Sequence, residues 1–576
     1  MMTLSDCTRP VELCLSPGIL LVAVPKAVTM ALASRALRVA RQFRSAWSCT
    51  SLIPHNFGSK QADVSSYILA ACLAAAVGSD VIASDGDGFV CGNKRADLPT
   101  FSASDIAKHD RADTGIWVAY KEGVYDVTSF LQQHPGGAEK LMLAAGKQID
   151  PFWALYAQHK AENVQRLLET LRIGNVDAQS FAKQTASNAS SDPADPYRAE
   201  PSRHPGLVVN SQQPFNAETP QEMIVDSFIT PNSIFYKRNH MPVPTITPDE
   251  YRLHIEVPTS IGRRTLSLSL ADLGKLPQAK VVATLQCAGN RRSDIADVKP
   301  VRGLNWRLGA IGNAEWRGVY LRDVLKAAGV QDAQGAKHVH FEGLDADPTG
   351  TVYGSSIPIE TALSASGDVL LATHMNGEPL LPDHGYPVRA LVPGTVAARS
   401  VKWLGKVVVD EFESNSHWQQ RDYRGFSPNV DWHNVDFSTS PSIQELPVTS
   451  AITSPRAGTV FDPSEGSISL QGYAWSGGGR AVVRVDVSID GGKTWHTADL
   501  NDKAAAHADS QPYGRVWSWM PWEIEIDLPE DTPSELQLVC KATDRSYNTQ
   551  PQEASSVWNL RGVLSTAWHR ITIQAK

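Results

Sequence analysis

Cysteine is scarce in this chain, and its scarcity excludes two classes of structure. The 576 residues include 7 cysteines. They lack both the paired spacing of a zinc site and the number that a disulfide framework needs. Four of them lie within the first 72 residues, which leaves Cys91, Cys287 and Cys540 for the rest of the chain. Any chemistry that needs a cysteine must therefore depend on a single thiol.

Two other features are also missing: a surplus of positive charge and a long apolar run. The formal net charge of −8 argues against a general nucleic-acid binder. The apolar run ILAACLAAAV at residues 68–77 is too short to span a bilayer, which takes about 20 residues. We expect a soluble mature protein with no stable membrane anchor and no nucleic-acid partner. The length, with 42% hydrophobic and 20% charged residues, predicts several globular domains.

The N-terminal region resembles a targeting signal. Residues 30–60 contain no Asp or Glu, which is typical of a mitochondrial presequence. Four arginines recur there at every third position: Arg35, Arg38, Arg41 and Arg44. Followed by the apolar run at 68–77, the segment resembles the bipartite presequences of intermembrane-space proteins. We therefore predict that residues 1–83 form a mitochondrial presequence and that the mature protein lies in the intermembrane space. A disordered leader followed by a short buried helix is the alternative, and Met30 is a second plausible start.

A histidine in a turn motif marks the first folded unit. The phrase GVYDVTSF at 123–130 is followed by His134, Pro135 and two glycines. Alternating apolar residues before and within this phrase predict short strands. Proline and the glycine pair force a turn and let the backbone approach a ligand closely. His159 follows later in the chain, and neutral imidazoles are suitable axial ligands for iron.

These phrases make residues 98–177 resemble a cytochrome b5 domain. The resemblance implies an α+β fold in which His134 and His159 ligate one haem b per chain. With both axial positions filled, such a haem transfers single electrons and does not bind substrate. Residues 178–200 are rich in Ala, Ser, Asp and Pro and show no periodicity, which predicts a flexible linker.

Cys287 lies in the phrase LQCAGNRR. The preceding residues 281–285, VVATL, predict a strand, so the cysteine falls where a strand enters a glycine-containing loop. A thiolate there, with Arg291 and Arg292 close behind, is a plausible soft ligand for a heavy metal near an anion pocket. An isolated cysteine is more often buried and inert. The interpretation therefore depends on the motifs around it.

Several polar loops separate the apolar runs around Cys287. Pro242 and Pro244 indicate that Arg238 and His240 lie on an irregular loop. The later loops read RGLNW at 302–306, GLDADPTG at 343–350, DHGYPVR at 383–389, SVKWL at 400–404 and RDYRG at 421–425. Loops that converge from a rigid scaffold are where binding sites are built.

With these motifs, residues 201–446 resemble the molybdopterin-binding domain of the sulfite oxidase family, which also includes eukaryotic nitrate reductases. The resemblance implies a mixed α+β domain in which Cys287 is the protein thiolate on the molybdenum of one molybdopterin per chain. The other cofactor contacts that it implies are Tyr236, Lys237, Arg238, Asn239, His240, Asp345, His384, Arg389, Ser400, Val401 and Lys402. The anion pocket that it implies consists of Cys287, Arg238, Arg292, Trp306, Tyr423 and Arg561. Arginine forks match the geometry of an oxyanion such as sulfite.

The C-terminal part of the sequence reads as strands. Residues 483–489 alternate strictly, and Asp490-Gly491-Gly492 predicts a hairpin turn. With a further strand-like phrase at 467–470 and no helical period, residues 447–576 are predicted to form an immunoglobulin-like β-sandwich. By resemblance this is a dimerisation domain, which implies a homodimer.

The sequence as a whole predicts a multidomain α+β oxidoreductase. By resemblance it oxidises sulfite to sulfate, with water as the oxygen source, and passes electrons singly through the haem to cytochrome c. One alternative is a nitrate reductase or another oxyanion enzyme on the same cofactor. The order of the domains and the absence of an expected flavin module argue against it. The other alternative is a haem electron carrier whose molybdenum domain is inactive, and the retention of Cys287 and every loop motif argues against that.

Overall fold

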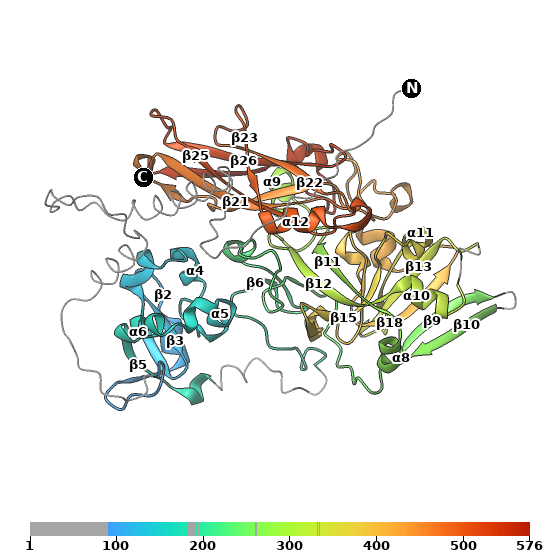
Figure 1. Cartoon of the computed structure of the whole chain (residues 1–576), viewed down its shortest axis with the longest axis horizontal. Coiled ribbons are helices and arrows are strands. Elements are labelled where there is room, and N and C mark those ends of the chain that lie inside the picture. The colour runs from blue at the N-terminus through green and yellow to red at the C-terminus, as the bar shows by residue number, and fades with distance from the viewer. Residues whose placement is uncertain (1–89, 182–191, 193–194, 260–261, 331, 333–334) are drawn as a thin grey trace, which may run out of the picture. The chain divides into compact units, whose positions relative to one another are not determined.

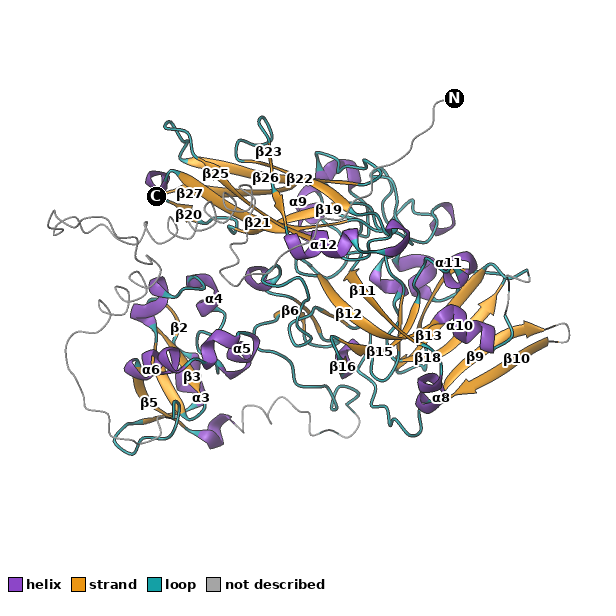
Figure 2. Cartoon of the chain, viewed as in Figure 1, coloured by secondary structure: helices purple, strands orange, loops and turns teal. Residues whose placement is uncertain are grey.

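The computed structural model describes residues 90–181, 192, 195–259, 262–330, 332 and 335–576 (Figure 1). The predicted presequence at 1–83 lies outside the described residues. Within the described ranges, no helix is both long enough and apolar enough to cross a membrane. Helices and strands are mixed up to about residue 446, and strands dominate after it (Figure 2).

The haem-type unit is built on a five-stranded sheet in the order β1-β5-β4-β3-β2. Its strands are β1 Thr100–Phe101, β2 Asp110–Arg111, β3 Gly115–Tyr120, β4 Gly123–Asp126 and β5 Arg172–Val176. Its helices are α3 Ala103–Ala107, α4 Ala138–Met142, α5 Asp150–Leu155 and α6 Glu162–Thr170, with 3-10 turns η1 Thr128–Gln133 and η2 Ala157–Lys160. The antiparallel pair β3 and β4 confirms the strands predicted from the alternating apolar residues. Ile116, Val118 and Val124 are fully buried, as that alternation requires.

Three sheets form the unit that follows. One has the order β10-β9-β18-β13-β14, the second β11-β12-β15-β16 with β17 beside β15, and the third β6-β7-β8. The strands are β6 Val208–Ser211, β7 Asn216–Glu218, β8 Lys237–Arg238, β9 Leu253–Thr259, β10 Gly262–Leu268, β11 Gln278–Gln286, β12 Ile311–Tyr320, β13 His338–Ala346, β14 Val352–Pro358, β15 Leu370–Met375, β16 Glu378–Pro379, β17 Arg389–Leu391 and β18 Leu404–Asp410. The helices and turns are η3 Gln221–Met223, α8 Leu270–Lys275, α9 Arg292–Val298, α10 Leu321–Ala327, α11 Ile359–Leu363, η4 Pro382–His384, η5 Ala397–Arg399, the π-helical turn η6 Trp418–Asp422 and η7 Phe437–Thr439. This is the mixed α+β domain that the sequence predicts.

Strand β11 carries the chain to Cys287. It pairs with β12 along its whole length, from Gln278 opposite Val319 to Gln286 opposite Ile311. The residues at its end are buried, so the following loop starts from a rigid base. The predicted strand before Cys287 is confirmed. Arg238 differs from its prediction: it ends the short strand β8 instead of lying on an irregular loop, because its backbone pairs with Asn216 of β7.

Two facing sheets make up the C-terminal unit, in the orders β19-β21-β25-β24 and β20-β27-β26-β22-β23. Their strands are β19 Thr449–Ser454, β20 Val460–Phe461, β21 Ser467–Trp475, β22 Val482–Ser488, β23 His496–Thr497, β24 Asp499–Leu500, β25 Met520–Asp527, β26 Glu535–Asp544 and β27 His569–Ala575, with turns η8 Pro463–Glu465, η9 Pro512–Gly514 and η10 Ala554–Val557. Side chains from both sheets share one apolar core, which confirms the sandwich. The helix α12, Asp502–Asp509, was not predicted; Asn501 caps it by accepting from the Ala504 N–H.

Buried hydrogen bonds join the C-terminal unit to the Cys287 region. Arg291 is 1% exposed, and its Nη1 donates to the carbonyls of Ser450 and Ala567, both at 2.9 Å. The Tyr473 hydroxyl donates to the Leu308 carbonyl at 2.9 Å. These bonds fix the C-terminal unit against the loop that follows Cys287, so residues of both units can share one site.

Candidate active site and haem site

The two predicted haem ligands face each other across a cavity. His134 follows η1 and His159 lies in η2. Their rings are nearly parallel, with an interplanar angle of 7° and centroids 6.3 Å apart. Two imidazoles bound to one metal atom at about 2 Å each have centroids about 6 Å apart. The ring geometry therefore fits an iron atom between them.

The surroundings of these histidines also fit a haem. The cavity between them has a volume of about 250 Å³ and is lined mainly by apolar side chains. His134 Nδ1 lies 3.0 Å from the Gly137 carbonyl, which leaves its Nε2 for a metal. A Cβ at Gly136 would lie 2.9 Å from His134 Cε1, so the glycine makes room for the ring. The structure thus shows a physical reason for the His-Pro-Gly-Gly phrase.

Cys287 lies directly after β11 and is 6% exposed. Its backbone N–H donates to the Ala310 carbonyl at 3.0 Å, and the Gly289 N–H donates to its Sγ at 3.4 Å. A Cβ at Gly289 would meet the guanidinium of Arg292 at 2.5 Å, so glycine at this position lets Arg292 pass close to the loop.

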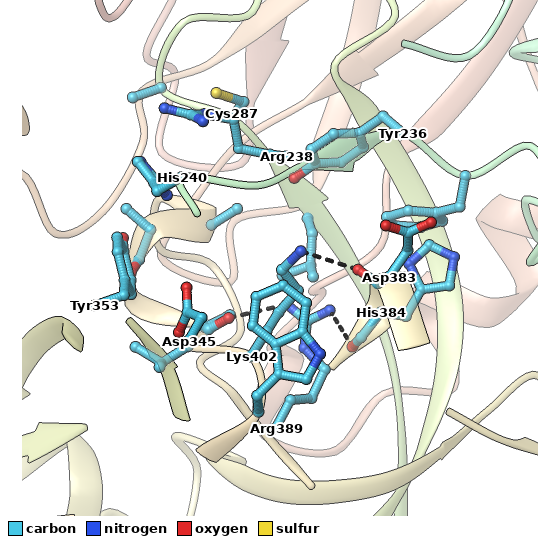
Figure 3. A pocket seen from close by; sticks show the side chains of 18 of the residues that line it. Tyr236, Arg238, His240, Cys287, Asp345, Tyr353, Asp383, His384, Arg389 and Lys402 are labelled. Atoms are coloured by element: carbon cyan, nitrogen blue, oxygen red, sulfur yellow. Dashed lines mark hydrogen bonds between the residues drawn. The ribbon is translucent and has the colours of Figure 1, made fainter. Parts of the chain in front are cut away.

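One cavity is lined in part by Cys287 (Figure 3). Ten of the predicted cofactor contacts line it: Tyr236, Arg238, His240, Cys287, Asp345, His384, Arg389, Ser400, Val401 and Lys402. The other two, Lys237 and Asn239, do not line the cavity but contact residues that do. Lys237 Nζ is 3.1 Å from His384 Nε2 and donates to the Phe235 carbonyl at 2.7 Å. Asn239 donates to Asp383 Oδ1 at 3.1 Å and accepts from Lys402.

Among the described residues, the first cavity contains a buried acid that lacks an ion pair, together with several buried bases. Asp345 is 4% exposed, and it forms no ion pair with any described residue. Burial raises its pKa and lowers the pKa of Lys402. Burial also holds the pKa of His240 and His384 well below the usual range, so both rings are neutral near pH 7. A buried acid beside buried bases suits a polar ligand that has ring N–H groups at one end and a phosphate at the other.

Cys287 also lines a second cavity. All six residues of the predicted anion pocket line it: Cys287, Arg238, Arg292, Trp306, Tyr423 and Arg561. Cys287, Arg238 and Tyr423 line both cavities, so they mark the junction between them. The Tyr423 hydroxyl lies 3.0 Å from His240 Nε2.

The second cavity is strongly positive. Arg292 donates to the carbonyls of Gly562 and Leu304, at 2.9 and 2.7 Å, and is in no ion pair with a described residue. Burial, with Arg238 and Arg561 nearby, lowers the pKa of Arg292. Arg561 pairs with Asp422 at 2.6 Å. An anion in this cavity would relieve the repulsion among the arginines.

Sequence reasoning missed several residues that line the two cavities. Tyr353 and Asp383 line the first, and Arg302 and Asp422 line the second. Three of these lie within quoted loop phrases, so their neighbours carried a signal. Tyr353 lies in β14, where its ring stacks on His240 at a centroid distance of 4.6 Å. Nothing in its local sequence distinguishes it from a core residue.

Family models match three parts of the chain. A cytochrome b5-like haem/steroid binding domain matches residues 102–177, and an oxidoreductase molybdopterin binding domain matches 240–418. A Mo-co oxidoreductase dimerisation domain matches 440–576, which supports the predicted homodimer. The haem and molybdopterin predictions are therefore confirmed at the level of the domains.

Several full-length proteins are also similar in sequence to this chain. A mitochondrial sulfite oxidase from Rattus norvegicus is 52% identical over 474 residues, covering 82% of this chain and 84% of the relative. A nitrate reductase from Hordeum vulgare is 37% identical over 413 residues, covering 69% of this chain and 44% of the relative. Among solved structures, the sulfane dehydrogenase SoxCD from Paracoccus pantotrophus matches with a TM-score of 0.50 at 24% identity, over 66% of this chain and 96% of that one, which shows a shared fold. Taken with the domain matches, these similarities show that the chain belongs to the sulfite oxidase family of molybdenum- and haem-dependent oxidoreductases.

Proposed function

We propose that this protein oxidises sulfite to sulfate, with water as the oxygen source. The observation that carries the proposal is the junction at Cys287. Cys287 lines both a cavity with contacts for an organic cofactor and a second cavity rich in arginine. A thiolate that holds a metal at this point would present that metal to an oxyanion. When bound, the molybdenum centre supplies oxygen-atom transfer, and the haem supplies one-electron transfer.

Each group of the chain has a definite task in this proposal. Cys287 would hold the molybdenum, Lys402 and Arg389 would bind the phosphate of the pterin, and Asp345 would bind its ring. Arg238, Arg292 and Arg561 bind the sulfite oxygens, because guanidinium forks match oxyanion geometry and stay charged. Trp306, 1% exposed, closes one side of the pocket and excludes water. The Tyr423 hydroxyl, which neutral His240 holds, donates to the anion.

The partners and location follow from the same assignment. His134 and His159 would both bind the haem iron, and the haem would then supply one-electron transfer. We propose cytochrome c as the electron acceptor and the mitochondrial intermembrane space as the location. The relatives named mitochondrial support the organelle.

Anaerobic mixing with sulfite tests the substrate and the electron path together. The oxidised holoprotein is mixed with sulfite, and the haem absorption is followed with time. We expect rapid haem reduction, and none in a Cys287→Ala variant that retains its haem. If the haem stays oxidised although molybdenum and haem are both present, the substrate assignment is wrong. Pre-reduced protein is then mixed with nitrate; oxidation of its haem would support the nitrate alternative.

A further inference from the structure

A buried ion pair joins Arg203 to Asp383, which lines the first cavity. Arg203 forms a two-pronged contact with Asp383: its Nε donates to Oδ2 at 2.8 Å and its Nη2 donates to Oδ1 at 2.9 Å. The two side chains are 11% and 5% exposed. The guanidinium carbon also lies 3.9 Å from the centroid of the Phe215 ring. Two parallel hydrogen bonds fix the orientation of an ion pair and also stabilise it.

Asp383 connects this ion pair to the cavity. Its Oδ1 accepts from Asn239 Nδ2 at 3.1 Å, and its backbone carbonyl accepts from Lys402 Nζ at 2.9 Å. The next residue, His384, has a carbonyl that accepts from Arg389 Nη1 at 3.0 Å. Figure 3 shows Lys402 and Arg389 converging on this Asp383–His384 segment. Two of the cations that line the cavity, Lys402 and Arg389, are thus both anchored on the segment that Arg203 holds.

Arg203 does not line the cavity, and it lies outside the matched molybdopterin region at 240–418. The Arg203 Nη2 that donates to Asp383 also pairs with Glu200, the last residue of the predicted linker. Glu200 Oε1 also accepts from the Val243 N–H at 3.0 Å. Contacts to Val243 and Asp383 therefore fix residues 200–203, where the chain enters the catalytic domain.

We propose that Arg203 is a positioning residue of the cofactor pocket: by fixing Asp383 it holds Lys402, Asn239 and Arg389 in place and slows the loss of molybdopterin. This inference rests on the proposed assignment of the cavity as the cofactor site. Partners that orient contact residues commonly change affinity by about 10- to 100-fold when they are removed. Without its arginine, Asp383 would be a buried carboxylate next to a wall that could then relax.

Cofactor release from the full-length holoprotein tests the inference. Protein is diluted into cofactor-free buffer, and the retained molybdenum and the fluorescence of the oxidised pterin are followed with time. We expect Arg203→Gln to release the cofactor about 10- to 100-fold faster than the unchanged protein. Arg203→Lys should fall between them, because lysine keeps the charge but not the two-pronged contact. It also provides a second variant should Arg203→Gln fold poorly.

Arg263→Gln is the matched control. Arg263 forms an ion pair with Asp410 in the same domain, and neither residue lines the cavity. This variant should release the cofactor at the unchanged rate. The unfolding midpoint of the cofactor-free protein is measured for each variant, because a merely structural role would lower that midpoint in proportion to the faster release. Faster release with an unchanged midpoint supports the positioning role, and equal acceleration in the control overturns it.

Two further variants separate the possible failures. Asp383→Asn alone and combined with Arg203→Gln completes a double-mutant cycle; non-additive release rates are expected, and additive rates overturn the proposed route through Asp383. Lys402→Ala probes the pocket itself. If it releases the cofactor quickly while Arg203→Gln does not, the inference fails and the pocket assignment stands. If both variants retain the cofactor, the pocket assignment fails and the inference fails with it.

Discussion

Replacing Arg238 with glutamine tests whether the arginine-rich cavity binds sulfite. Arg238 ends β8 and lines both cavities. Its Nη1 donates to Asn216 Oδ1 at 3.1 Å and to the Asn239 carbonyl at 2.5 Å, which holds the guanidinium at the junction. Glutamine retains a neutral donor but removes the positive charge. The change should therefore weaken the anion contact without emptying the cavity of polar groups.

The size of the effect follows from the contact that is lost. A hydrogen bond to a charged group contributes about 1.5–3 kcal/mol. Because each 1.4 kcal/mol is a factor of ten, the KM for sulfite should rise about 10- to 150-fold. The increase should shrink at high salt, since screening already weakens binding to the unchanged pocket.

The assay is steady-state sulfite oxidation, with molybdenum and haem content measured for every preparation. Arg252→Gln is a suitable control, because Arg252 is an exposed arginine of the same domain that donates to the Asp249 and Tyr251 carbonyls. Its KM should not change. An unchanged KM in a fully loaded Arg238→Gln protein would refute the role of Arg238 in the anion pocket.

Three other changes probe the thiolate, the haem and the C-terminal domain. Cys287→Ser should abolish sulfite turnover while the haem spectrum stays intact; full turnover would reject the ligand assignment. His159→Ala should remove the haem absorption but leave sulfite oxidation with an artificial acceptor, and a retained haem spectrum would show that His159 is not a ligand. His569 is buried, and its Nδ1 accepts from the Ile452 N–H at 3.1 Å; burial, with Arg291 nearby, lowers its pKa to about 4 from 6.5. Because the folded state disfavours the proton, this contribution to stability is complete above pH 6.5 and is lost as the pH falls towards 4, by about 3 kcal/mol. Chemical denaturation between pH 7 and 4 should therefore show a steeper loss for the unchanged protein than for His569→Gln, and parallel curves would contradict the assignment.

Local patterns in the sequence predicted the elements that carry Cys287 and His134. A buried strand ends where a polar loop with a glycine begins, and Pro135 with its glycines makes a turn whatever surrounds it. The strand β11 and the turn after His134 were therefore predictable from neighbouring residues alone. The helix α12 was not, because its apolar positions are alanines, which contribute little to a hydrophobic period.

The motif at residues 236–240 did not predict which of its side chains line the cavity. Five consecutive residues were assigned to the cofactor, yet Tyr236, Arg238 and His240 line the cavity while Lys237 and Asn239 point behind it. In an extended segment, successive side chains alternate between two faces, so a run of five contacts on one face is not possible. The extended conformation arises from the pairing of Arg238 with Asn216, and no residue near the motif reveals that pairing.

The proposed anion pocket depends on the C-terminal domain as much as on the molybdopterin-binding one. Arg561 comes from the region matched by the dimerisation model, and it pairs with Asp422, the neighbour of Tyr423. In the same segment, the Gly562 carbonyl accepts from Arg292 Nε, and the Leu564 N–H donates to the Ala288 carbonyl beside Cys287, both at 2.9 Å. The C-terminal domain thus supplies one arginine, orients a second and supports the loop of the thiolate. Because these bonds are buried and short-range, a shift between the two domains would displace all three at once, so the packing of the β-sandwich is part of the chemistry of the site.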